Sequence, residues 1–261
     1  MGIDVSPDWW QSLFDEIYLI TDARSVCDAE VTRREVDVFC ELLSLRPSDR
    51  ILDLCGGQGR HSLELCARGY GECTVLDYSE VLLEHGRAAA AVQDSPIEFL
   101  QGDAGDTGLP GEGFDHVLLL GNSIGYLAEE GGDLRILEEA RRLLRPGGRL
   151  LIDVTDGARV RETFNPNAWH EIEEDIVVCR QRELDGDCVR AREMVISKEE
   201  GLVRDRSYAI RIYDPAVLEE LVQRAGFDVV DLRRGFSPRN GDGDYGFMNH
   251  RLLVTAKKRE A

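Results

Sequence analysis

A run of glycines between a short apolar segment and a helical segment constrains this chain more than any other feature. Residues 50–54 (RILDL) are apolar enough for a buried strand, and residues 60–68 (RHSLELCAR) have helical spacing. Between them, Gly56, Gly57 and Gly59 predict a turn that few other residue types could follow. A strand, a glycine turn and a helix start together present free backbone N–H groups to a small ligand.

The rest of the chain alternates strands with helices, which predicts an α/β fold with a parallel sheet covered on both faces. Apolar runs predict strands at 73–77, 97–101, 114–120, 149–154, 227–233 and 247–257, and helical spacing predicts helices at 6–20, 28–44, 79–93, 132–144 and 214–225. Between 157 and 213, alternation predicts antiparallel strands at 171–183, 188–198 and 202–213, with a hairpin turn at 185–187. We therefore expect one domain with a small antiparallel β insertion.

The composition excludes several classes of protein. The chain has 31 basic and 50 acidic residues and a net charge of −19, so it would repel nucleic acid and anionic membranes. Its seven cysteines are odd in number and include no CxxC pair, which indicates a reducing cytoplasm, without disulfides or a metal site. No apolar run approaches the length of about 18 residues that a membrane span needs, and residues 1–10 do not resemble a signal peptide.

The residues around the glycine turn narrow the choice of ligand. A dinucleotide fingerprint needs a third glycine where Ser62 stands, which disfavours an NAD-dependent oxidoreductase, and no lysine follows to make a P-loop. Asp53 instead precedes the turn, and its carboxylate would repel a phosphate and suit a ligand that carries an amine.

The pattern Asp53-x-Cys55-x-Gly57-x-Gly59 resembles motif I, [DE]-x-G-x-G-x-G, of the class I S-adenosylmethionine-dependent methyltransferases, with Cys55 in place of the first glycine. Asp77 resembles the acid that holds the ribose hydroxyls in that family, and Asp103 with Ala104 resembles the segment that contacts adenine. Residues 114–122 resemble motif IV, and residues 144–150 resemble the turn before the fifth strand. The resemblance implies a Rossmann-like, doubly wound, mainly parallel seven-stranded sheet with one antiparallel strand. The implied cofactor is S-adenosyl-L-methionine, and S-adenosyl-L-homocysteine is the product.

The resemblance also assigns residues to the site. The expected cofactor contacts are Tyr18, Asp53, Cys55, Gly56, Gly57, Gly59, Asp77, Tyr78, Asp103, Ala104, Gly121, Asn122 and Ser123. Tyr126 is the candidate catalytic group beside the transferred methyl, with simple packing at a helix start as the alternative. Independently of the resemblance, the insertion mixes aromatic and basic side chains on alternating strands. Its residues Trp169, Tyr208 and Arg211 are candidate acceptor contacts, with an ordinary packed sheet face as the alternative.

The implied organisation has three parts. Residues 1–48 form a helical cap over the cofactor, residues 49–156 and 214–261 form the cofactor-binding core, and residues 157–213 form a substrate lid. The core and lid together would perform in-line methyl transfer to a nitrogen or oxygen of a small molecule, which requires alignment and exclusion of water more than a strong base.

The segment after the fourth strand bears on the acceptor. The motif Asn-Pro-Pro-Tyr, typical of methyltransferases of nucleic-acid bases and glutamine, is replaced by Gly121-Asn122-Ser123-Ile124, which favours enzymes that resemble those of natural-product and amino-sugar tailoring. Methylation of a macromolecule and a non-catalytic cofactor-binding scaffold subunit are the alternatives, and Cys55 alone favours the scaffold. We expect a monomer or a homodimer.

Overall fold

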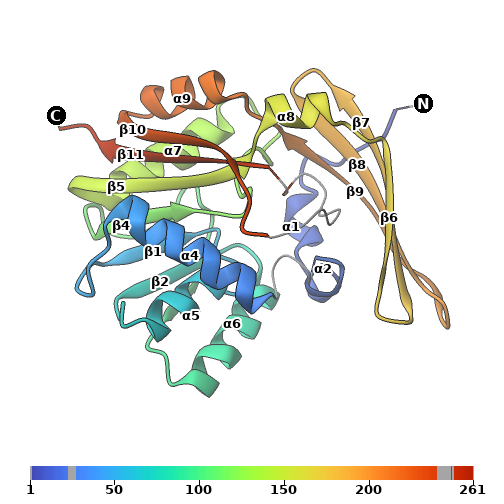
Figure 1. Cartoon of the computed structure of the whole chain (residues 1–261), viewed down its shortest axis with the longest axis horizontal. Coiled ribbons are helices and arrows are strands. Elements are labelled where there is room, and N and C mark those ends of the chain that lie inside the picture. The colour runs from blue at the N-terminus through green and yellow to red at the C-terminus, as the bar shows by residue number, and fades with distance from the viewer. Residues whose placement is uncertain (1, 23–27, 240–247, 249, 261) are drawn as a thin grey trace.

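The computed structural model describes residues 2–22, 28–239, 248 and 250–260 of the 261-residue chain. A seven-stranded sheet lies in one part of the molecule, and a four-stranded antiparallel sheet lies beside it (Figure 1). The strands of the first sheet have the order β10-β11-β5-β4-β1-β2-β3, and β11 runs antiparallel to both of its neighbours. These strands are β1 Ile51–Leu54, β2 Cys73–Asp77, β3 Glu98–Gln101, β4 Phe114–Leu119, β5 Leu144–Thr155, β10 Phe227–Phe236 and β11 Arg251–Lys258. The predicted doubly wound, mainly parallel sheet is therefore confirmed.

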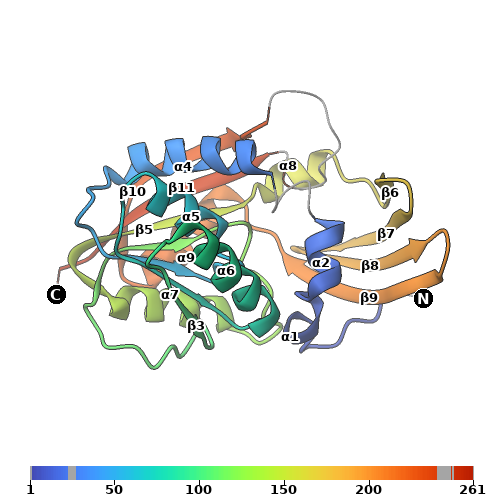
Figure 2. The ribbon, with the colours of Figure 1, turned by 90° about the horizontal axis from the view of Figure 1, so that it is seen from below.

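Helices cover both faces of this sheet (Figures 1 and 2). Helices α7 and α9 pack against β4, β5, β10 and β11, while α4, α5 and α6 pack on the other face. The helices are α1 Trp10–Leu13, α2 Glu16–Thr21, α4 Ala29–Leu43, α5 Arg60–Ala67, α6 Glu80–Gln93, α7 Gly132–Leu143, α8 Gly157–Glu162 and α9 Pro215–Arg224. None of the helices in the described part of the chain is both long and apolar enough to cross a membrane.

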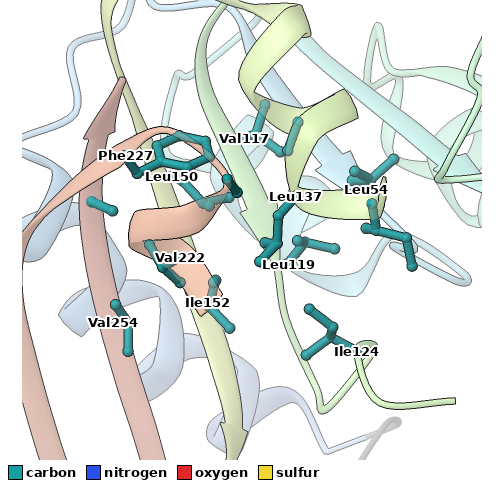
Figure 3. Packing of buried hydrophobic residues seen from close by; sticks show 14 of the residues in the cluster. Leu54, Val117, Leu119, Ile124, Leu137, Leu150, Ile152, Val222, Phe227 and Val254 are labelled. Atoms are coloured by element: carbon teal, nitrogen blue, oxygen red, sulfur yellow. The ribbon is translucent and has the colours of Figure 1, made fainter. Parts of the chain in front are cut away.

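The core under α7 and α9 fixes the strand ends at which the candidate site lies (Figure 3). Side chains from β1, β4, β5 and β11 meet those of the two helices there; Figure 3 labels Leu54, Val117, Leu119, Ile124, Leu137, Leu150, Ile152, Val222, Phe227 and Val254. Leu54 and Leu119 are at most 1% exposed, and burial of such a side chain contributes roughly 2 kcal/mol. Strands β1 and β4 end at these two side chains, so the turns that follow start from buried positions.

The second sheet is the predicted insertion, with one strand more than expected. It contains β6 Asn167–Ile172, β7 Ile176–Asp185, β8 Cys188–Ser197 and β9 Gly201–Arg211, in that order. The single strand predicted at 171–183 was wrong, because the backbone turns between β6 and β7 at Glu173, where φ is +52°. The hairpin between β7 and β8 is confirmed, since Asp185 pairs with Cys188.

The N-terminal segment lies between the two sheets (Figures 1 and 2). The single helix predicted at 6–20 is two short helices, because the Asp15 side chain accepts a hydrogen bond from the backbone N–H of Tyr18 and starts α2 anew. The segment is tied to the insertion at Glu183, which accepts from the N–H of Ile3 at 2.8 Å, and at Arg204, which pairs with Asp15 at 2.7 Å. The strand predicted at 247–257 begins at Arg251 in the described part, and residues 247 and 249 lie outside it.

Candidate active site

Two left-handed turns leave neighbouring strands at the carboxyl edge of the sheet. After β1, the backbone has positive φ at Cys55 (+62°), Gly57 (+58°) and Gly59 (+69°). These are the three positions at which motif I has glycine, so Cys55 adopts a conformation that an ordinary side chain occupies only at a cost. Gly56 does not have positive φ; it is confined by Asp53, whose Cγ would lie 2.7 Å from an added Cβ.

The Asp53 carboxyl is buried beneath this turn. It is 1% exposed, and its Oδ2 accepts a hydrogen bond from the Ser62 hydroxyl at 3.0 Å. Its Oδ1 has no hydrogen-bond partner among the described residues. Burial raises the pKa of Asp53 to about 6, against the opposing effects of the Ser62 hydroxyl and Arg60. The group is thus an acceptor that is already desolvated and lacks one donor.

Asp77 ends β2 and shapes the same turn. Its Oδ2 accepts from the N–H of Gly57 at 2.8 Å, and its Oδ1 accepts from the N–H of Ser79 at 2.9 Å. Burial raises the pKa of Asp77, although these backbone donors oppose the rise. The N–H of Tyr78 also acts on this carboxylate, whose two oxygens together offer about four lone pairs, so it keeps room for a further donor.

The turn after β4 is held by β5. Gly121 and Asn122 have φ of +66° and +67°, and Asn122 is 7% exposed. The side-chain oxygen of Asn122 accepts from the N–H of Thr155 at 2.9 Å. The Ser123 hydroxyl donates to the carbonyl of Leu120 at 2.6 Å. The Asn122 side chain is therefore a structural part of the turn rather than a free group.

One cavity of about 290 Å³ joins these turns to the N-terminal helices and the insertion. Most of the residues predicted for the site line it: Tyr18, Asp53, Cys55, Gly56, Gly57, Asp77, Tyr78, Asp103, Ala104, Gly121, Asn122, Ser123, Tyr126 and Tyr208. Gly59 does not; it precedes α5, and a Cβ there would lie 2.8 Å from a Phe99 ring carbon. Its place in the motif is thus explained by packing beneath the turn.

Three predicted residues of the acceptor region differ in their surroundings. Trp169 is 69% exposed on β6 and does not line the cavity. Arg211 does not line it either, because its guanidinium pairs with the buried Asp133 of α7. Tyr208 of β9 does line the cavity, so the structure brings only one of the three to the site.

Aromatic side chains from three parts of the chain meet in the cavity wall. The ring of Trp9 lies 5.0 Å from that of Tyr126 and 5.7 Å from that of Tyr208, and Phe14 stacks on Tyr126 at 5.6 Å. We call Trp9, Phe14, Tyr126 and Tyr208 the aromatic wall. Burial raises the pKa of Tyr126 well above its usual value, so its hydroxyl stays protonated and cannot take up a proton at neutral pH.

Sequence reasoning missed a buried charge network at the opposite side of the cavity. Glu35 of α4 accepts from Arg251 of β11 at 2.5 Å, contacts His61 at 2.9 Å and pairs with Arg60. Although burial opposes it, the two arginines and His61 hold the pKa of Glu35 far below its usual value. Burial lowers the pKa of His61 to about 4, so its ring is neutral at pH 7. The available signals were an arginine and an acid, Arg251 and Asp153, that each adjoin an apolar run in strands β11 and β5.

A second missed cluster lies on the insertion side. Glu193 of β8 accepts from Arg180 at 2.6 Å and from Arg204 at 2.5 Å, and Arg180 also pairs with Asp22 at 3.2 Å. All four side chains line the cavity. The sequence predicted sheet faces here but could not show which strands would bring opposite charges together.

Comparisons with known proteins agree with this geometry. The profile of a family described as "Methyltransferase domain" matches residues 51–148. The chain is 28% identical over 220 residues to the putative methyltransferase YqeM of Bacillus subtilis, and this match covers 82% of this chain and 86% of that protein. It is 34% identical to the ubiquinone/menaquinone biosynthesis C-methyltransferase UbiE of a Ruegeria species, over 44% of this chain and 46% of that one. Among solved structures, the sugar N-methyltransferase KedS8 from a Streptoalloteichus species matches with a TM-score of 0.66 and 21% identity, covering 100% of this chain and 99% of that one.

Proposed function

We propose that this chain, a class I S-adenosylmethionine-dependent methyltransferase, transfers the methyl group to a nitrogen or oxygen of a small-molecule acceptor. The observation that carries the proposal is that one cavity is lined both by the turns at the strand ends and by the aromatic wall. S-adenosylmethionine, when bound, would supply a methyl group on a positively charged sulfur. The acceptor would attack the methyl carbon in line with the S–C bond, and S-adenosylhomocysteine would leave. The protein then has to hold the two reactants in line and exclude water.

The buried acceptors of the core fit the cofactor. The partnerless Oδ1 of Asp53 suits the ammonium group of the methionine part, because an ionised donor would satisfy a carboxylate oxygen that burial has left bare. The remaining acceptor capacity of Asp77 suits the ribose hydroxyls. Gly56 and Gly57 let the cofactor approach the backbone closely.

The remaining cofactor contacts follow from their places in the cavity. In the proposal, Asp103 and Ala104 contact the adenine, and Tyr18, Tyr78 and the backbone at Cys55 and 121–123 enclose the rest. Tyr78 is 41% exposed and lies edge-on against Trp10, with the ring centres 4.8 Å apart. The N-terminal helices therefore act as the proposed cap over the cofactor.

The acceptor, in this proposal, binds against the aromatic wall beneath the insertion. Trp9 is 6% exposed and contacts both Tyr126 and Tyr208, so a ring placed there would lose its water. Tyr126 keeps its proton and acts by shape and hydrogen bonding rather than as a base. An acceptor that is already nucleophilic, such as an amine in its free-base form, suits this arrangement.

One structural match that extends over the insertion is to a sugar N-methyltransferase. The match to the C-methyltransferase covers 44% of this chain, whereas the match to the sugar N-methyltransferase covers all of it and so includes the insertion. The insertion carries Tyr208 and with it part of the proposed acceptor site. A cytoplasmic location and a monomeric or homodimeric state remain our predictions.

The test is methyl transfer from labelled S-adenosylmethionine to a panel of amino sugars, aromatic amines and phenols, with a quinol, bulk tRNA and protein as competitors. Label in an amine or a phenol supports the proposal. Label only in tRNA or protein, or only on a quinol carbon, refutes it. Calorimetry with S-adenosylmethionine is the parallel measurement: a folded chain that binds it but labels no acceptor supports the scaffold alternative, and one that binds none refutes the proposed methyl transfer.

A further inference from the structure

The two turns at the cavity edge are connected through buried charges. One turn leads into α5, whose first residues Arg60 and His61 both contact Glu35 of α4. Glu35 in turn accepts from Arg251, whose other terminal nitrogen pairs with Asp153 of β5 at 2.8 Å. Three elements, α4, β11 and β5, thus meet at one guanidinium group, and α5 joins them through Glu35.

Asp153 extends the connection to the second turn. Its Oδ2, which already contacts Arg251, also accepts from the N–H of Gly121 at 3.3 Å. Its main-chain carbonyl accepts from the N–H of Asn122 at 2.9 Å. The side chain and the main chain of Asp153 therefore both bind residues in the left-handed conformation. One of these residues, Asn122, is not a glycine.

The energetic cost of this network argues that stability alone does not explain it. Arg251 is 2% exposed, and its Nε–H has no hydrogen-bond partner among the described residues. Buried ion pairs of this kind can often be replaced by apolar side chains with no loss of stability, because desolvation offsets much of the attraction. Arg251 also lines the cavity, so the network lies directly beneath the proposed cofactor site.

We infer that Arg251 is a positioning residue: with Glu35 and Asp153 it fixes the spacing between the start of α5 and the Gly121–Ser123 turn. The spacing matters because both turns line the cavity, and beyond the pairing of β1 with β4 they are linked by a long contact, from the Ser123 hydroxyl to the carbonyl of Cys55 at 3.4 Å. The proposed function enters only in the choice of ligand, since the inference itself concerns the geometry of the turns.

The experiment compares Arg251→Met with the wild type in the full chain. Amide hydrogen exchange at Gly121 and Asn122 should accelerate selectively. Both N–H groups donate to Asp153, which would lose the ion pair that holds its side chain in position. The dissociation constant for S-adenosylhomocysteine should rise about tenfold, in the range known for residues that couple a site without touching its ligand. Arg251→Lys should restore much of the slow amide exchange and of the ligand affinity, because the lysine ammonium group would still lie between Glu35 and Asp153.

The matched control is Arg233→Met. Arg233 lies on the neighbouring strand β10 and pairs with Asp231 at 2.7 Å and Glu41 at 3.5 Å, but its side chain is 45% exposed. This variant should leave both exchange at the turn and ligand affinity unchanged.

Folding is tested separately. If Arg251→Met alone does not fold, the variant Glu35→Gln, Asp153→Asn, Arg251→Met removes all three charges and should fold while keeping fast exchange at Gly121. A folded variant with wild-type exchange at the turn, or one in which exchange rises equally throughout the chain, would overturn the inference. If the wild type binds no S-adenosylhomocysteine, the proposed function fails, and the exchange data still decide the role of Arg251.

Discussion

Replacement of Asp53 by asparagine should stabilise the empty protein while it weakens cofactor binding. The rise in the pKa of Asp53 from 3.8 to about 6 corresponds, at about 1.4 kcal/mol for each pH unit, to a penalty of about 3 kcal/mol for the ionised group in the folded state. Asparagine removes the charge and can keep the bond from the Ser62 hydroxyl at its side-chain oxygen. The asparagine NH₂ group would stand where Oδ1 lies, at a position without a hydrogen-bond partner among the described residues. Burial of these unsatisfied N–H donors costs roughly 1–2 kcal/mol.

The net gain is therefore about 1–2 kcal/mol at pH 7.5, which should raise the melting temperature by about 3–6 °C in a chain of this size. The sign of the pH dependence follows from the raised pKa. The penalty on the wild type is complete above pH 6 and vanishes below its unfolded pKa of 3.8, so the difference between the two proteins should shrink as the pH falls from 6 to 4.

Thermal melting and calorimetry across pH 4–8 measure both effects. Wild-type affinity for S-adenosylmethionine should fall as the pH drops through about 6, because protonated Asp53 no longer attracts the ammonium group, whereas the variant should bind weakly at every pH. The matched control is Asp228→Asn, an exposed acid paired with Arg259 at 2.8 Å, which should change stability by less than about 1 kcal/mol. An Asp53→Asn protein that melts below the wild type at pH 7.5 and binds the cofactor equally well would refute the reasoning.

Other substitutions test the turn and the cavity wall. Cys55→Gly should raise the melting temperature by relieving about 1 kcal/mol of left-handed strain and should leave cofactor affinity intact, and a large loss of affinity would reveal a role for the thiol. Gly59→Ala should destabilise the chain by at least about 2 kcal/mol in denaturant titration, because its φ is +69° and its new Cβ would meet the ring of Phe99; wild-type stability would contradict the predicted clash. Once an acceptor is known, Tyr208→Ala should raise its KM by about tenfold and Trp169→Ala should not change it, and the reverse result would move the acceptor site to the outer face of the insertion.

Local signals were enough to predict the central sheet and the two turns that line the cavity. Buried strands, glycine turns and helix starts are each encoded within a few residues, as at 50–62, and the order of the elements then limits the topology. The break at Asp15 was missed because the apolar spacing of residues 6–20 continues across both short helices, and the Asp15 side chain decides the matter by capping α2.

The rest of the site depends on contacts that no local pattern records. Glu35 and Arg251 are separated by 216 residues, and only the arrangement of α4 against β11 brings them together. Arg211 reads as an acceptor contact by its place in a strand, yet Asp133 of α7 neutralises it. The alternation of polar and apolar residues shows that the two faces of the insertion differ. It does not show which face covers the cavity, so the sequence could not distinguish Tyr208, which lines the cavity, from Trp169, which is exposed.

Some unfavourable local features lie where β1 and β4 end. Cys55 and Asn122 are non-glycine residues with positive φ, and Asp53 is a buried carboxyl with one bare oxygen. Elsewhere the same strands are closely packed, with Leu52, Leu54 and Val117 showing no exposed surface. A sheet so well packed can hold strained turns and desolvated charges at its edge, and a cationic ligand is what would satisfy the bare oxygen of Asp53. The buried charge of Asp53 lowers the stability of the empty protein, and a bound S-adenosylmethionine would offset that loss. Asp53→Asn should therefore raise the stability of the empty protein and weaken cofactor binding.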